Sequence, residues 1–204
     1  MSAPLLYLAS KSPRRQSLLA QLGIEFETLL LREALGRERD VVEVALDEEP
    51  APHYVERMAR TKAQVGWQRM QDRKLAERAV LGADTEVVLD GEIFGKPRNA
   101  NDAVRMLKRL SGRTHQVLTA VAIRYRNAIE VDLSSSRVTL RRLAAAEIER
   151  YVQTGEPLDK AGSYALQGRA AAFVARIEGS YSGIVGLPLC ETATLLARVG
   201  VHVL

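Results

Sequence analysis

The chain has 204 residues, 47% of them hydrophobic and 26% charged, with a formal net charge of +4 at pH 7. This composition is ordinary for a globular protein, and no apolar run reaches the ~20 residues that cross a bilayer. The first residues also lack the pattern of a secretory leader. We therefore expect a cytoplasmic protein with no membrane partner.

The mild basicity admits a nucleic-acid ligand, but acidic residues are interspersed among the basic ones and aromatic residues make up only 5% of the chain. Few side chains are available to stack on bases. A small polyphosphate ligand fits the charge equally well, and we expect no nucleic-acid partner. The single cysteine, Cys190, excludes an internal disulfide, and we expect it to be a buried small residue at a helix start rather than a nucleophile.

The first half of the chain predicts strands alternating with helices. An apolar strand at 5–8 leads into a helix at 13–22, then a strand at 26–31, a charged and irregular exposed segment at 32–52, and a helix at 52–71 with apolar residues at helical spacing. Short strands are predicted at 80–83 and 85–89, the second paired with 92–94 around the turn at Asp90-Gly91. Asp84 is thereby expected where one strand ends and the next begins.

The second half predicts paired strands between helices. Expected are a helix at 101–110, long strands at 114–125 and 129–140, a helix at 144–154, a strand at 172–177 within a glycine-rich tract, a helix at 188–199 and a strand at 201–203. Alternating elements at both ends with antiparallel strands between them predict an α/β fold whose twisted sheet is mixed and flanked by helices. No repeat or linker divides residues 1–204, which predicts a single domain.

The turn after the first strand predicts an anion site. Ser12 suits the N-cap and Pro13 the first position of the following helix, so backbone N–H groups and the positive end of the helix dipole would lie beside Arg14 and Arg15. Ser10 adds a hydroxyl, and a phosphate binds well at such a helix start. The alternative is that both arginines are merely solvated.

A carboxylate, two lysines and an amide complete the candidate site. Asp84, followed by Thr85, can bind a divalent cation and accept a proton from water, or merely cap a turn. Lys96, restrained by the proline after it, and Lys62, on the apolar side of its helix, can neutralise phosphate charge; Lys62 can instead snorkel to solvent. The Gln167 amide matches the donor and acceptor of a uracil or thymine edge, or ties down its loop.

Six ordered motifs that span nearly the whole chain resemble those of the Maf family of nucleoside triphosphate pyrophosphatases. They are Ser10 to Arg15, Tyr54 to Ala63, Gly82 to Thr85, Gly95 to Pro97, Leu110 to Val117, and the tract from Lys160-Ala161-Gly162 to Gly186-Leu187-Pro188. Gln167, followed by Gly168, resembles the branch that acts on dTTP and UTP. The resemblance implies two lobes around a central cleft and hydrolysis to a monophosphate and pyrophosphate, a house-cleaning role in the nucleotide pool.

The resemblance also assigns roles by position. Asp84 matches the proton acceptor; Arg14, Thr85 and Gln167 match positions that select substrate; Lys62 and Lys96 match lysines that hold phosphates. A divalent cation, Mg²⁺ or Mn²⁺, is implied between Asp84 and Glu43 of the segment Asp40-Val41-Val42-Glu43. Because Val42 replaces an acid that is usual in the family, Glu33, Asp47 and Glu49 stay open as alternatives to Glu43.

The family further implies a homodimer and an association with control of the division septum and cell-division arrest. That association leaves a second function class open, in which the chain is a non-catalytic sensor of nucleotides that regulates septum formation. Pyrophosphate release under turnover conditions separates the two functions.

Overall fold

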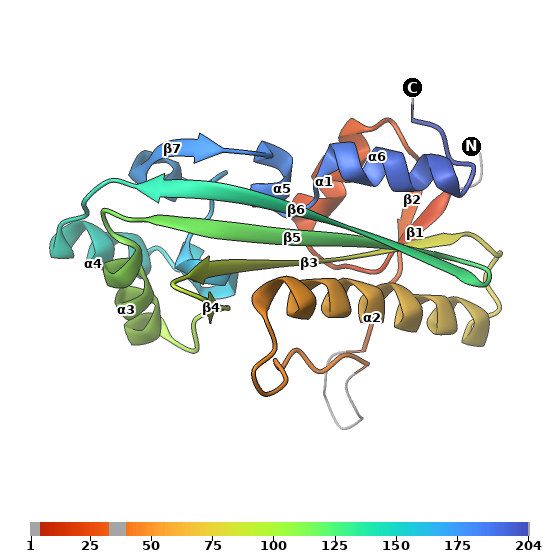
Figure 1. The fold of residues 1–204 in the computed structure, drawn as a ribbon, viewed down its shortest axis with the longest axis horizontal. Coiled ribbons are helices and arrows are strands. Elements are labelled where there is room, and N and C mark those ends of the chain that lie inside the picture. The colour runs from red at the N-terminus through yellow and green to blue at the C-terminus, as the bar shows by residue number, and fades with distance from the viewer. Residues whose placement is uncertain (1–4, 33–39, 204) are drawn as a thin grey trace. The chain divides into compact units, whose positions relative to one another are not determined.

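The structure is a computed structural model that describes residues 5–32 and 40–203 (Figure 1). The strands are β1 (Leu6–Leu8), β2 (Phe26–Thr28), β3 (Ala79–Leu89), β4 (Glu92–Phe94), β5 (Thr114–Tyr125), β6 (Ala128–Leu140) and β7 (Val174–Glu178). The helices are α1 (Pro13–Gln21), α2 (Ala51–Asp72), α3 (Ala100–Leu110), α4 (Ala145–Gln153), α5 (Tyr181–Val185) and α6 (Leu189–Arg198). Short 3₁₀ turns lie at Glu156–Asp159, Ala161–Ser163 and Arg169–Phe173.

The seven strands form one mixed sheet, which confirms the predicted α/β class. Their order is β2-β1-β3-β5-β6-β7, and β4 pairs with β3. The strand β1 is parallel to both β2 and β3, whereas β3 with β4 and β6 with β7 are antiparallel. No helix of the described residues is both long and apolar enough to pass through a membrane.

The chain divides into two compact units that alternate along the sequence. The first comprises residues 1–84, 119–134 and 186–204, and the second comprises residues 85–118 and 135–185. The single domain over 1–204 and the central cleft between two lobes stay predictions.

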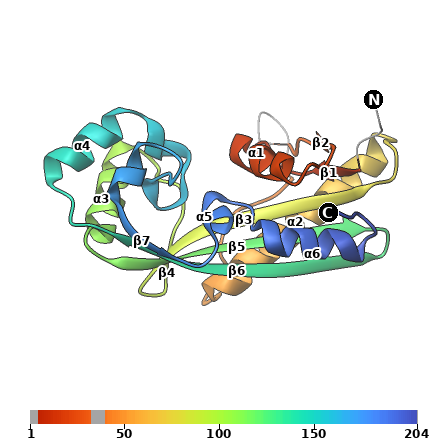
Figure 2. The same ribbon diagram turned by 90° about the horizontal axis from the view of Figure 1, so that it is seen from above.

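In the first unit, α2 covers one face of the sheet and α1 and α6 cover the other (Figures 1 and 2). The α2 side packs Trp67 and Met70 against Tyr7, Leu29 and Val80. The helix approaches β3 closely because both surfaces carry small residues. A Cβ atom at Gly82 would lie 2.5 Å from the backbone nitrogen of Ala63 and 2.6 Å from the backbone oxygen of Ala59. Glycine at position 82 therefore sets how near α2 lies to the sheet.

The second unit has its own core, in which α3 and α4 pack together and a histidine is fully enclosed. His115 is 3% exposed, and its Nε2 lies 2.8 Å from the hydroxyl oxygen of Tyr164. Burial lowers the pKa of His115 from 6.5 to about 4. A histidine stays neutral there at pH 7, because charging it would place an unsolvated cation in the core.

This buried histidine predicts a loss of stability in acid. The folded protein binds fewer protons than the unfolded chain between pH 6.5 and about 4, so unfolding becomes easier as pH falls through this range. We expect the wild type to lose about 2 to 3 kcal/mol more unfolding free energy than His115→Gln between pH 7 and pH 4. Urea titrations at each pH measure the difference, and parallel curves for the two proteins would contradict the assignment.

Four local predictions were wrong. Residues 79–89 form one strand rather than two, because β5 lies beside β3 after the pairing with β1 stops at Leu81. Residues 201–203 are not a strand, and β2 ends at Thr28 rather than at residue 31. Cys190 is exposed rather than buried, because it lies on the outer side of the first turn of α6. The glycine-rich tract contains 3₁₀ turns and α5, which were not predicted, and its strand is β7.

Candidate active site

A lysine held between two carboxylates forms the centre of the candidate site in the first unit. Lys62 Nζ lies 2.6 Å from Asp84 Oδ1 and 2.5 Å from Glu43 Oε1. The side chains of Lys62 and Asp84 are 12% and 8% exposed, whereas that of Glu43 is 46% exposed. Lys62 therefore meets anions rather than snorkelling to solvent.

The register of the sheet explains why Asp84 faces Lys62. Alternate residues of a strand face the same side, so Asp84 shares the α2 side of β3 with Gly82. Gly82 brings the helix close, and Lys62 lies next to Ala63 in the contact. Asp84 lies within β3, not at its end as predicted, but it does lie beyond the last residue paired with β1. The predicted position of Asp84 between two strands is therefore wrong, because β3 continues through it to Leu89.

The hydroxyl-rich turn follows β1, in the same unit. Ser12 is the N-cap of α1 and Pro13 its first residue, as predicted, but the Ser12 hydroxyl makes no capping hydrogen bond. The backbone N–H of Ser12 instead donates to Ser10 Oγ at 3.2 Å. Arg15 Nε donates to the carbonyl oxygen of Gly186 at 2.9 Å, and its Nη1 lies 3.4 Å from Ser10 Oγ. Arg15 thus ties the turn to the segment before α6, and Arg14 is half-buried beside it.

The candidate metal-binding acids between 33 and 49 have different contacts in the structure. Glu43 contacts Lys62, Glu49 pairs with Arg57 with its Oε2 2.6 Å from Nη2, and Asp47 is exposed. Glu33 lies outside the described residues. Of the acids in this segment that the structure describes, Glu43 is the one that joins Lys62 and Asp84.

The second unit carries Thr85, Lys96 and Gln167. Thr85 is half-buried in β3, Lys96 is exposed two residues after the end of β4, and Gln167 is exposed at the corner of a turn. That turn closes with a hydrogen bond from the Gly168 N–H to the Ala165 carbonyl at 3.0 Å. Because Gln167 is exposed, it is available to a ligand and does not act as a buried tie for its loop.

Sequence reasoning missed Glu156, which supports the Gln167 turn. Its carboxylate accepts from the hydroxyl of Tyr151 at 3.0 Å and from the backbone N–H of Arg169 at 3.1 Å. A Cβ at Gly168 would lie 2.1 Å from Glu156 Oε1, so the glycine beside Gln167 makes room for this carboxylate. The dipeptide Gln167-Gly168 was the only signal in the sequence, and it did not name the partner.

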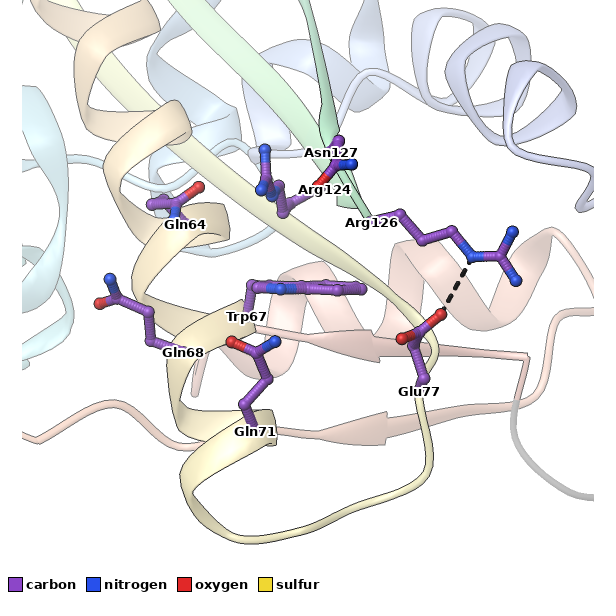
Figure 3. A pocket seen from close by; sticks show the side chains of 8 residues that line it. All are labelled: Gln64, Trp67, Gln68, Gln71, Glu77, Arg124, Arg126 and Asn127. Carbon is purple, nitrogen blue, oxygen red and sulfur yellow. Dashed lines mark hydrogen bonds and ion pairs between the residues drawn. The ribbon is translucent and has the colours of Figure 1, made fainter.

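A separate pocket of about 470 Å³ lies in the first unit, between α2 and the turn that joins β5 to β6 (Figure 3). Glutamine side chains of α2 line it together with Arg124 and Arg126. Arg126 Nε is paired with Glu77 Oε1 at 3.0 Å, and Arg124 Nε is buried against the wall, with the guanidinium carbon 5.8 Å from the centre of the Trp67 ring. None of the predicted site residues lines this pocket.

A mixed α/β sheet that carries, in one unit, a lysine between two carboxylates and a basic, hydroxyl-rich turn is typical of a protein that cleaves phosphate anhydrides. Residues 5–199 match the Maf family, described as Maf-like protein, and the chain belongs to that family. Curated relatives agree over nearly their full length. A dTTP/UTP pyrophosphatase of Nitrosospira multiformis is 54% identical over 97% of this chain and 96% of its own.

A second relative and one solved structure were also similar to this chain. The dTTP/UTP pyrophosphatase of Aromatoleum aromaticum is 53% identical over 96% of this chain and 95% of its own. Among solved structures, the Ham1 protein of Staphylococcus aureus has a TM-score of 0.42 and 12% identity, covering 66% of this chain and 71% of that one. That structural likeness is too low to bear on function.

Proposed function

We propose that this chain is a pyrophosphatase that hydrolyses dTTP and UTP to the nucleoside monophosphate and pyrophosphate, with a house-cleaning role in the nucleotide pool. The observation that carries the proposal is the meeting of Asp84, Lys62 and Glu43 on one side of β3. Relatives that are 53–54% identical over nearly their full length and are named dTTP/UTP pyrophosphatases support the substrate class.

Asp84 is proposed as the proton acceptor because its two oxygens differ. Oδ1 accepts from Lys62 at 2.6 Å, whereas Oδ2 is buried without a hydrogen-bond partner among the described residues. A buried, unsatisfied carboxylate oxygen favours a donor such as water. The water oxygen bonds to the α-phosphorus, its proton passes to Asp84, and the bond from that phosphorus to the bridging oxygen of the β-phosphate breaks.

Cationic side chains are proposed to hold the leaving pyrophosphate. Lys62, Arg14 and Arg15 supply positive charge in the first unit, where Ser10 and Ser12 add hydroxyl groups. A fixed cation stabilises the charge that develops on the phosphoryl oxygens. Lys96 and Thr85 are assigned to substrate through their match to the family motifs.

The acid pair fits a hard divalent cation, although no group of three or more His, Cys, Asp or Glu side chains within residues 5–32 and 40–203 is arranged to hold a metal ion. Asp84 and Glu43 already converge on one ammonium group, and carboxylate oxygens are the donors that Mg²⁺ and Mn²⁺ prefer. These two residues would hold the cation, and substrate phosphates would complete its ligands. When bound, the cation would neutralise phosphate charge.

Gln167 is proposed to read the pyrimidine edge. In Gln167→Glu the carboxylate still accepts from the N3–H group but no longer donates to O4, and it sets lone pairs against that oxygen. We expect kcat/KM for UTP to fall about 10- to 100-fold, with a smaller loss for GTP. Gln68→Glu, on the exposed side of α2, is the matched control. Equal losses for UTP and GTP would show that Gln167 does not read the base.

The function is tested by incubating the protein with dTTP, UTP and the other nucleoside triphosphates, with and without Mg²⁺ or Mn²⁺, and by measuring pyrophosphate and monophosphate together. Equal amounts of the two products establish cleavage between the α and β phosphates. Tight nucleotide binding without either product would favour the alternative of a nucleotide-sensing regulator of septum formation.

A further inference from the structure

The segment Asp40–Glu49 carries Glu43 but has no helix or strand to hold it. Of its apolar side chains, Val41 is half-buried and the others are exposed. Val42, Val44 and Leu46 are 61%, 62% and 63% exposed. The apolar residues directly on either side of Glu43 are thus exposed, and their burial does not hold Glu43 against Lys62.

One end of the segment is held by a buried ion pair. Arg69 of α2 donates to both oxygens of Asp40, from Nε to Oδ2 at 3.0 Å and from Nη2 to Oδ1 at 2.5 Å. The backbone N–H of Arg32 also donates to Asp40 Oδ2, at 2.8 Å. The Asp40 side chain is only 2% exposed, and the hydrogen bonds from Arg69 lower its pKa.

The other end is held in the same way. Arg57 of α2 donates from Nε to Glu49 Oε1 at 2.7 Å and from Nη2 to Oε2 at 2.6 Å. Its Nη2 also reaches the carbonyl of Val44 at 3.0 Å, and Glu49 accepts from the backbone N–H of Leu46 at 3.0 Å. The hydrogen bonds from Arg57 lower the pKa of Glu49 to about 2. Paired arginine and carboxylate groups of this kind fix orientation as well as distance.

Three acids of the segment pair with three basic residues of α2, and the order of the acids along the chain is the reverse of the order of their partners. Asp40 meets Arg69, Glu43 meets Lys62 and Glu49 meets Arg57. At the rise of an α-helix, Arg57 and Arg69 lie about 18 Å apart along the axis, with Lys62 between them. The segment therefore runs antiparallel to the helix and is fixed on both sides of Glu43.

We propose that Arg57 and Arg69 are positioning residues: by fixing both ends of Asp40–Glu49 on α2, they present the Glu43 carboxylate beside Lys62 and Asp84. The inference rests on the proposed function, because it concerns the acid pair that would hold the divalent cation. Neither arginine contacts Asp84, so their effect is on how well Glu43 is placed.

The test measures Mn²⁺ binding directly, by electron paramagnetic resonance of free Mn²⁺, and pyrophosphate release from UTP over a range of Mn²⁺ concentrations. In Arg69→Gln and Arg57→Gln we expect about 10- to 100-fold weaker Mn²⁺ binding, the usual effect of removing a group that orients a ligand. At saturating Mn²⁺, kcat should return to within about threefold of wild type, because Asp84 and Lys62 are unchanged. Arg73→Gln is the matched control, since Arg73 caps the C-terminus of α2 and its guanidinium donates to the Leu30 carbonyl rather than to an acid of the segment.

Reversed pairs distinguish positioning from general stabilisation. Arg69→Asp combined with Asp40→Arg should restore most of the Mn²⁺ affinity that Arg69→Asp alone loses. Arg69→Gln should also add nothing in a Glu43→Gln background, because the carboxylate to be positioned is gone. Lower thermal stability with unchanged Mn²⁺ affinity would overturn the proposal, and so would additive effects with Glu43→Gln.

The same measurements distinguish failure of the proposed function from failure of the positioning role. A wild type that binds Mn²⁺ but releases no pyrophosphate would reject hydrolysis, while the Mn²⁺ affinities of the variants would still decide the role of the arginines. A wild type that binds no Mn²⁺, alone or with UTP, would reject both the cation site and the positioning role.

Discussion

Asp84→Asn is expected to lower kcat for UTP and dTTP by about 10²- to 10⁴-fold, the usual contribution of a placed general base. Asparagine keeps an oxygen that can accept from Lys62, where Asp84 Oδ1 now lies 2.6 Å from Nζ. It replaces Oδ2, which has no hydrogen-bond partner within residues 5–32 and 40–203, with an NH₂ group that cannot take a proton from water. The local geometry is thus retained while the proposed chemistry is removed.

Asp102→Asn is the matched control for this variant. Asp102 is as buried as Asp84, at 7% against 5% exposure, but its carboxylate bonds the Arg98 N–H at 3.0 Å and Arg105 at 2.5 Å. We expect Asp102→Asn to lower the stability of the fold and leave kcat unchanged. We expect Asp84→Asn to lower kcat and leave the stability largely unchanged. Steady-state pyrophosphate release and thermal unfolding separate the two effects. Full activity in Asp84→Asn would show that another group accepts the proton.

How far the sequence predicted the site depends on the type of signal. Local signals were reliable: Pro13 after Ser12 marked the start of α1, and Asp90-Gly91 marked the turn between β3 and β4. The pattern of alternating elements also predicted the mixed sheet. Each of these features depends on residues that are near one another in the chain. Such features can therefore be predicted from one sequence alone.

Contacts between distant residues were not predictable in the same way. Nothing near Asp40 or Glu49 indicated that each pairs with an arginine of α2, and the segment between them was described only as exposed and irregular. The break predicted at Asp84 was also wrong, because the continuity of β3 depends on β5, a neighbour more than twenty residues further along the chain. Pairing of this kind needs the folded arrangement.

Gly82→Ala is expected to have the largest effect on folding, and it shows why the site depends on close backbone packing. The added methyl group would lie 2.5 Å from Ala63 N and 2.6 Å from Ala59 O, and both atoms belong to the backbone of α2. A backbone atom cannot rotate away as a side chain can, so the helix must move from the sheet. Overpacking that forces backbone to shift costs about 1 to 3 kcal/mol and occasionally more.

Trp67 makes the movement measurable, because it is the single tryptophan of the chain, lies on α2 and is 5% exposed. In Gly82→Ala we expect its fluorescence to shift to longer wavelength, together with a lower urea midpoint. Gly95→Ala is the control, since its methyl group would meet only Glu86 Oε2, at 3.8 Å. An unchanged urea midpoint in Gly82→Ala would show that α2 can accommodate the added methyl group without loss of stability.

The same displacement of α2 should also lower the rate of hydrolysis. Lys62 is adjacent to Ala63, so any shift of α2 that accommodates the methyl group also moves Nζ from Asp84 Oδ1. Folded Gly82→Ala protein, assayed well below its unfolding midpoint, should therefore show a reduced kcat for UTP, because a displacement of about 1 Å is enough to lose roughly 10²-fold in rate. Normal kcat in a destabilised Gly82→Ala protein would separate the packing of α2 from the placement of Lys62.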